Sequence, residues 1–243
     1  MHRVRASRWL NGLILIGSVA TWASQEAFEA SPFSARYRLS RDDMSVGETR
    51  VSLDLGPDGT YVYRAETTPT ALLSLVREDR ILEQSEGRWL NGRPRPDRYT
   101  YRREGSRVDR HLELTFDWAR KRVRIQDERS SWVMAVPDGA LDKLVQQLTY
   151  SHDLGQGGRD ASYRVADGGL LKEYKYRVVG REELTTPLGP FETLRVSRSK
   201  DQGPADYTLW LAPRLEHLPV RILRRHQGKL YRMDLIALDP GSP

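Results

Sequence analysis

An alternation of apolar and polar residues with a period of two is the feature that most restricts how this chain of 243 residues can fold. It begins with Phe33, Ala35, Tyr37 and Leu39, which alternate with serine and arginine, and similar rows recur along most of the chain. A period of two is typical of strands that bury one face. Turn signals such as residues 56–59 (GPDG) separate the rows at short intervals. We therefore expect a mainly β fold: a strongly curved antiparallel sheet or open barrel of roughly 12 strands.

One stretch, residues 138–153, departs from this alternation. Leu141, Leu144, Val145 and Leu148 are spaced i, i+3, i+4 and i+7, which predicts a helix with one apolar face. Its first residue is an aspartate, which can accept a backbone N–H group at the helix start. We expect this helix to press its leucine face into the concavity of the sheet.

The first residues have the three parts of a secretory signal peptide. Three arginines precede an apolar run over residues 10–20, and small residues at 21 and 23 suit a cleavage site. The run is shorter than the roughly 20 residues that cross a bilayer, although an uncleaved anchor is the competing interpretation. No cysteine follows the run, which excludes a lipoprotein anchor. The expected organisation is a signal peptide (1–23), an extension (24–31), a single β domain (32–238) and a tail (239–243).

Residues 70–76 (TALLSLV) interrupt the strand pattern after a proline. The first interpretation is that this apolar stretch closes one end of the sheet over the core. The alternative is an apolar gate at the mouth of a ligand site. We favour closure of the core.

Composition excludes several kinds of site. The chain has no cysteine, so disulfides, thiolate metal sites and a cysteine nucleophile are excluded. Its histidines lack the H-x-x-x-H spacing of metal sites, and neither a P-loop nor a G-x-G-x-x-G stretch occurs. We expect no metal and no cofactor. The net charge of +6 includes three arginines of the signal segment, and the remaining charges are interleaved, so we expect no nucleic-acid partner.

Asp142 is the one acidic residue that draws attention, because it follows an apolar residue inside the expected helix. It could be a buried acid with a raised pKa, as some catalytic acids are. Alternatively, it is a carboxylate that serves the helix start or accepts hydrogen bonds from nearby strands. We prefer the second interpretation.

Tyrosines recur in many of the expected strands and could line a cavity in the concave face of the sheet. Tyrosine is also a common strand residue, so the alternative is that these side chains form the core. The candidates for lining a ligand site are Leu141, Leu144, Leu148, Tyr99, Tyr101, Tyr174, Tyr176 and Trp210.

Several short motifs, in their order along the chain, resemble an exported bacterial family known only as a domain of unknown function. They lie at residues 33–37 (FSARY), 137–144 (PDGALDKL), 186–196 (TPLGPFETLRV), 210–213 (WLAP) and 218–222 (LPVRI). The resemblance covers about residues 32–238 and brings no catalytic residues with it. A more distant similarity of architecture links the expected fold to the periplasmic lipoprotein carriers, which are curved antiparallel sheets with helices over an apolar cavity.

Three functional hypotheses remain open at this stage. The first is a monomeric, non-enzymatic periplasmic carrier or binding module for an apolar or amphipathic ligand, either a lipid or a glycan. The second is a hydrolase-like enzyme that acts on envelope lipid or glycan. The third is an envelope scaffold that binds other proteins. A cavity of about 300–1,000 Å³ would favour the first hypothesis, whereas a cleft with converging perturbed acids would favour the second.

Export can be tested directly on the mature protein. If residues 1–23 are removed as a signal peptide, N-terminal sequencing of the exported protein should begin near Ser24. A membrane-bound protein that still begins at Met1 would contradict the cleaved signal and support the anchor.

Overall fold

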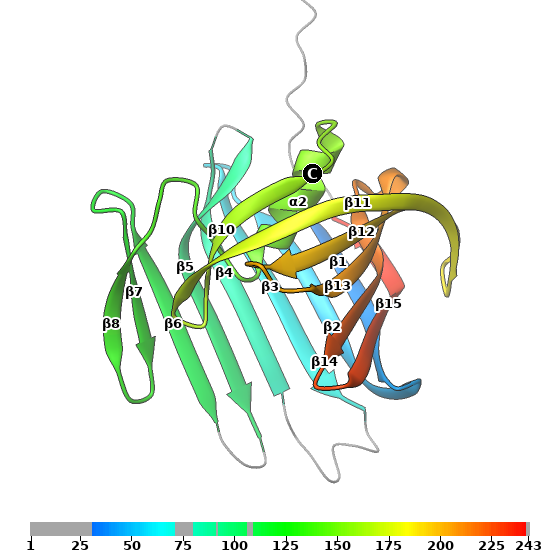
Figure 1. Cartoon of the computed structure of the whole chain (residues 1–243), viewed down its shortest axis with the longest axis horizontal. Helices are drawn as coiled ribbons and strands as arrows, with labels where there is room; N and C mark the ends of the chain where they lie inside the picture. Colours follow the sequence, from blue (N-terminus) through cyan, green and yellow to red (C-terminus); the bar gives the residue numbers. More distant parts are fainter. Residues whose placement is uncertain (1–30, 71–79, 91, 106–108, 242–243) are drawn as a thin grey trace, which may run out of the picture.

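The computed structural model describes residues 31–70, 80–90, 92–105 and 109–241. In these ranges the strands form one continuous sheet that curls around one α-helix, α2 (Val145–Gly155) (Figure 1). The first half of the sheet contains β1 (Phe33–Arg41), β2 (Met44–Leu55), β3 (Thr60–Pro69), β4 (Arg80–Leu90), β5 (Arg93–Glu104), β6 (Arg110–Asp117), β7 (Arg122–Asp127) and β8 (Ser131–Ala135). The second half contains β9 (Leu141–Asp142), β10 (Ala161–Asp167), β11 (Leu170–Thr186), β12 (Gly189–Lys200), β13 (Ala205–Ala212), the short helix η1 (Pro213–Leu215), β14 (Leu218–His226) and β15 (Lys229–Pro240).

The expected fold class is confirmed: the protein is mainly β, with a large curved sheet and one α-helix among the described residues. The sheet has 15 strands rather than about 12, and it does not close into a ring, because β8 and β9 remain at its two edges. The count differs partly because β9 has only two residues, too few to produce an alternating pattern.

The sheet consists of two meanders joined by one ladder. Strands β1 to β8 pair in sequence order, and so do β10 to β15. The two meanders meet where β1 pairs with β15, from Phe33 opposite Pro240 to Arg41 opposite Tyr231. β9 is the exception to the antiparallel pattern, since it lies parallel to β10.

The second meander curls back over the concave face of the first, as Figure 1 shows for β10 and β11. Two contacts from the β9 segment to β4 hold it there. The hydroxyl of Ser85 donates to the carboxylate of Asp142 at 2.5 Å, and the ammonium of Lys143 lies 2.9 Å from the carboxylate of Glu83. The interior of the curl is therefore partly polar.

Tyrosines fill much of this interior. The buried tyrosines are Tyr37, Tyr61, Tyr63, Tyr99, Tyr150, Tyr163, Tyr174 and Tyr176. All of them except Tyr63 form a hydrogen bond through the hydroxyl group to another part of the protein. Buried hydroxyl groups need such partners, so these side chains have the contacts of a packed core.

The helix begins later than the expected residue 138. Residues 137–140 form a turn in which the N–H of Ala140 donates to the carbonyl of Pro137, and Gly139 has a φ of 76°. Asp138 is exposed and contacts Lys121 at 2.5 Å instead of capping the helix. Its expected role belongs to Asp142, whose Oδ1 accepts the backbone N–H groups of residues 144 and 145, each at 2.8 Å.

The expected apolar face of the helix is confirmed only in part, by the fully buried Val145 and by Leu144 and Leu148, which pack against the core cluster. Leu141 lies in β9 rather than in the helix, and Leu144 and Leu148 are only half-buried. The buried residues of α2 include Gln146 and Thr149 as well as apolar side chains. The reason is the polar interior of the curl: a helix packed against tyrosine hydroxyls needs hydrogen-bonding groups on its buried face.

Some expectations fall outside the described residues. These are the signal peptide (1–23), the start of the extension (24–30), most of the interrupted stretch (71–76) and the end of the tail (242–243). Within the described ranges, no helix has the length and apolar character needed to cross a membrane.

The buried charge of Asp142 leads to a prediction about pH. Burial raises the pKa of this carboxyl from its ordinary 3.8 to about 6, although hydrogen bonds from Ser85, Val145 and Leu144 act in the opposite direction. The folded state therefore binds the proton more tightly than the unfolded chain does. This contribution to stability is present at low pH and is lost as the pH rises from about 4 to about 6.

The variant Asp142→Asn keeps an oxygen acceptor for the helix start but carries no charge. Urea unfolding of both proteins should show the stability of the parent falling, relative to the variant, by about 2.4 kcal/mol between pH 4 and pH 7. Subtracting the unfolding free energy of the variant from that of the parent at each pH cancels the contributions of the other titrating groups. A difference that stays constant across this range would contradict the prediction.

Candidate functional site

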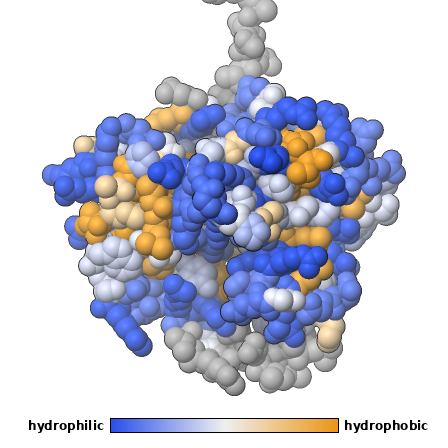
Figure 2. All heavy atoms as spheres, viewed as in Figure 1, coloured by the Kyte–Doolittle hydropathy of each residue, from blue (hydrophilic) through white to orange (hydrophobic). Residues whose placement is uncertain are grey.

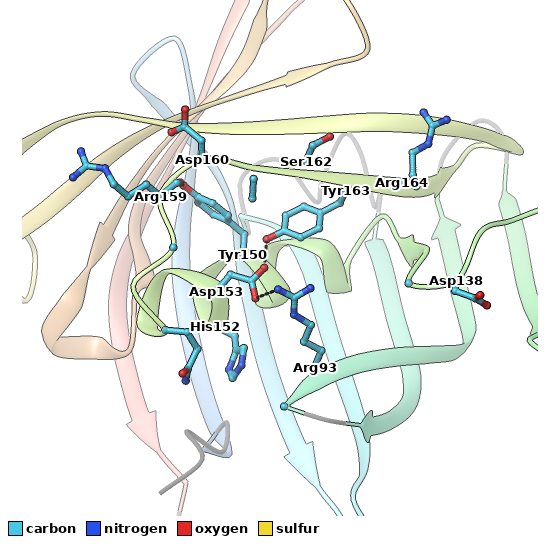
Figure 3. A pocket seen from close by; sticks show the side chains of 15 residues that line it. Arg93, Asp138, Tyr150, His152, Asp153, Arg159, Asp160, Ser162, Tyr163 and Arg164 are labelled. Atoms are coloured by element: carbon cyan, nitrogen blue, oxygen red, sulfur yellow. Dashed lines mark hydrogen bonds and ion pairs between the residues drawn. The ribbon is translucent and has the colours of Figure 1, made fainter. Parts of the chain in front are cut away.

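A cleft with a volume of about 880 Å³ lies beside the C-terminal part of α2. Its walls come from four segments: the start of β5, the turn at residues 138–139, α2 with the loop after it, and β10 (Figure 3). The side chains labelled in Figure 3 are Arg93, Asp138, Tyr150, His152, Asp153, Arg159, Asp160, Ser162, Tyr163 and Arg164. Most of these are polar or charged, so the cleft is suited to a polar ligand.

Asp153 forms the centre of the cleft and is fully paired. Its Oδ1 lies 3.0 Å from the guanidinium of Arg93, and its Oδ2 accepts the hydroxyl hydrogen of Tyr163 at 2.7 Å. Burial raises the pKa of Tyr163, and the hydrogen bond to Asp153 raises it further, so the phenol remains a neutral donor. The negative charge of Asp153 is therefore offset within the site.

The side chain of Tyr150 forms one wall of the cleft and is held in place by its neighbours. Its ring stacks on that of Tyr176, with centroids 4.1 Å apart, and lies edge-on to the ring of Tyr163 at 6.5 Å. Its hydroxyl donates to the backbone carbonyl of Arg159 at 2.7 Å. This bond ties the loop that follows α2 to the core and sets the position from which the Arg159 side chain extends.

Two arginines of the cleft form no ion pair within the described part of the chain, although Arg164 lies opposite Glu173 of β11 and its charge helps to lower the pKa of that carboxyl. Arg159 and Arg164 are exposed, and their side chains have no ion pair or hydrogen bond within the described part of the chain. The nearby acids are engaged elsewhere: Asp138 contacts Lys121 at 2.5 Å, and Asp160 lies 3.7 Å from Arg177. Three arginines and three aspartates line the cleft, and Arg159 and Arg164 are the two of these arginines that form no ion pair.

His152 separates the cleft from a second, smaller cavity. Its imidazole is buried and lies edge-on to Trp89, with ring centroids 5.7 Å apart. Burial lowers the pKa of His152, so the ring is neutral at neutral pH. The second cavity has a volume of about 50 Å³ and lies between α2 and the sheet.

The structure places only one of the ligand-lining candidates at either space: Leu148 lines the small cavity. Tyr99 donates to Glu83 at 2.5 Å, Tyr174 donates to Asp167 at 2.8 Å, and Tyr176 donates to Gln146. These hydroxyl groups are occupied inside the protein.

The remaining candidates also lie away from the cleft. Tyr101 is half-buried with the ammonium of Lys143 5.4 Å from its ring centre. Trp210 is buried, and its indole N–H donates to Glu182. Leu141 and Leu144 pack in the core clusters. Ligand contact through any of these residues stays a prediction.

A separate charged cluster within the curl is centred on Asp167. Asp167 Oδ2 contacts the ammonium groups of Lys172 at 2.8 Å and Lys200 at 3.3 Å, and it accepts the hydroxyl hydrogen of Tyr174. Burial alone would raise the pKa of Asp167, but these partners hold it well below its usual range. The arrangement joins β10, β11 and β12.

Reasoning from the sequence missed the residues of the cleft because they come from separate segments of irregular pattern. One signal was present in residues 150–164, where two tyrosines, two arginines and three glycines lie in the last part of the helix and just after it. Such a stretch suits an open, polar surface near the end of a helix. Among the described residues, no group of His, Asp and Glu is arranged to hold a metal ion.

Comparison with known proteins identifies a family and a fold. A family model described as "Protein of unknown function (DUF3108)" matches residues 33–228. No curated protein matches the sequence. A crystal structure of a beta-barrel-like protein of domain of unknown function DUF1849 from Brucella abortus is similar, with a TM-score of 0.61 and 10% sequence identity. The match covers 89% of this chain and 100% of that one, and it shows the fold alone.

The bond between Tyr163 and Asp153 should contribute to stability. Removing the hydroxyl in Tyr163→Phe deletes a buried hydrogen bond to a charged acceptor, which should cost about 1.5–3 kcal/mol in urea unfolding. Tyr231→Phe is the matched control, because Tyr231 is half-buried and its hydroxyl has no partner in the described residues. Equal losses in the two variants would show that the Tyr163 bond adds nothing specific.

Proposed function

This chain belongs to the DUF3108 family, and from its geometry we propose that it is a non-enzymatic binding module that holds the anionic part of a cell-envelope ligand in the charged cleft. The observation that carries the proposal is the pair of exposed arginines, Arg159 and Arg164, which line the cleft and form no ion pair within the described residues. An arginine presents several N–H donors in a fixed plane and pairs well with a carboxylate or phosphate. An anion in the cleft would supply the missing partner.

The rest of the cleft supports binding by a prearranged site. Arg93, Asp153 and Tyr163 hold one another, and Tyr150 fixes the loop that carries Arg159. Groups that are already held in place lose little further freedom when a ligand binds. The volume of about 880 Å³ is in the range of small-molecule sites.

The other two hypotheses receive less support. The acid with a raised pKa, Asp142, has a fully buried carboxylate that holds the start of α2, so a substrate has no access to it. A scaffold would be favoured by a broad apolar surface. On the face shown in Figure 2, apolar side chains gather in patches separated by hydrophilic ones.

The proposal narrows the chemical class of ligand that the sequence predicts. An apolar or amphipathic ligand was expected, whereas the described cleft favours an anionic group, which both envelope lipids and acidic glycans carry. The cell envelope is proposed as the place of action because residues 1–23 have the pattern of a secretory signal.

Binding can be tested with pairs of small probes that differ in charge. Glycerol phosphate and glucuronic acid represent a lipid headgroup and an acidic sugar, and glycerol and glucose are their neutral counterparts. Titration followed by NMR should show the charged probes binding at least tenfold more tightly. The double variant Arg159→Gln, Arg164→Gln should lower their affinity by roughly 100-fold, since each charge-assisted contact is equivalent to about one factor of ten.

The matched control is the double variant Arg122→Gln, Arg124→Gln, which removes the same charge from two exposed residues of β7. It should bind the charged probes as the parent does. Equal losses in the two double variants would show that only overall charge matters, and would contradict a specific site in the cleft.

A further inference from the structure

We propose that the ligand of the charged cleft is an amphiphile whose acyl chain enters the small apolar cavity on the other side of His152. This inference rests on the proposed function and extends it, because it assigns the ligand a second, apolar part and a place to hold it. The cleft by itself would accept a water-soluble anion. The adjoining cavity distinguishes a lipid-like ligand from a sugar acid.

The cavity is lined mainly by apolar side chains from both halves of the sheet and from the helix. Its principal lining residues are Phe33, Leu53, Tyr63, Trp89, Leu148 and Leu218. Several of them, including Phe33, Leu148 and Leu218, are only half-buried. Half-buried apolar groups around a small void leave hydrophobic surface in contact with water, and an acyl chain would cover it.

The two spaces share one wall, His152, which lines both. Figure 3 shows the imidazole of His152 below α2, whereas the ring of Tyr163 lies above it. The apolar lining and the cleft therefore adjoin at this residue. A ligand whose charged group occupies the cleft can therefore direct its chain past His152 towards Leu148.

A polar atom next to the cavity fits the junction between the head and the tail of such a ligand. The indole N–H of Trp89 is buried and has no acceptor among the described residues. A buried donor without a partner is costly. The ester carbonyl that joins an acyl chain to its headgroup would provide the acceptor.

The size of the cavity limits how much of the chain it can hold. A volume of about 50 Å³ accommodates only the first few carbon atoms. Burial of one methylene group increases affinity by roughly fourfold. Affinity should therefore rise over the first few carbons and then level off.

The test uses glycerol phosphate and its butyryl, hexanoyl and octanoyl esters, each as a monomer in solution. In the parent, the dissociation constant should fall by roughly fourfold per methylene over the shortest chains. Leu148→Trp, which fills the cavity, should abolish this gain and leave the affinity for glycerol phosphate unchanged. Leu188→Trp adds the same side chain at an exposed position outside both spaces and should behave as the parent.

A second variant keeps the test decisive if Leu148→Trp does not fold. Trp89→Phe removes the indole N–H and should weaken binding of the esters by roughly tenfold without affecting glycerol phosphate.

If glycerol phosphate binds and the esters bind no more tightly, the acyl site is wrong while the proposed function stands. If the gain with chain length persists in Leu148→Trp, the chain binds elsewhere and the inference is overturned. If glycerol phosphate itself does not bind the parent, the proposed function fails first.

Discussion

The carboxylate of Asp142 holds the helix and the two halves of the sheet together. One oxygen accepts the Ser85 hydroxyl of β4 at 2.5 Å, and the other accepts the first backbone N–H groups of the helix segment at 2.8 Å. Because this group is fully buried, its hydrogen bonds have no competition from water. The start of α2 is thereby fixed against β4, and the positions of Tyr150 and Asp153 further along the helix follow from it.

The fold class could be predicted from the sequence because strand patterns are local: each strand shows its buried face in its own alternation. The start of the helix could not. Asp142 serves as its cap only because Ser85, 57 residues earlier in the chain, meets it across the curl. Reading the leucines as one helical face failed in part, and for a related reason, since Leu141 is part of a short strand whose partner lies in β10.

The candidate site was harder to predict than the fold. The tyrosines of the inner face were recognised as a group, yet the sequence does not show that Tyr99, Tyr174 and Tyr176 find partners within the protein. The cleft itself joins Arg93 of β5 to Asp153 of α2, and their proximity depends on the curvature of the entire sheet. Curvature accumulates over many strands and has no local pattern in the sequence.

The ladder between β1 and β15 bears on how the protein reaches this structure. Every other antiparallel pair joins strands that are neighbours in sequence, so each can form from a short stretch of chain. The β1–β15 ladder must bring together residues as distant as Phe33 and Pro240, and closing so long a loop carries a larger loss of chain entropy. Each meander can form from local pairings, whereas the ladder that joins them has the largest cost in chain entropy of any pairing in the sheet.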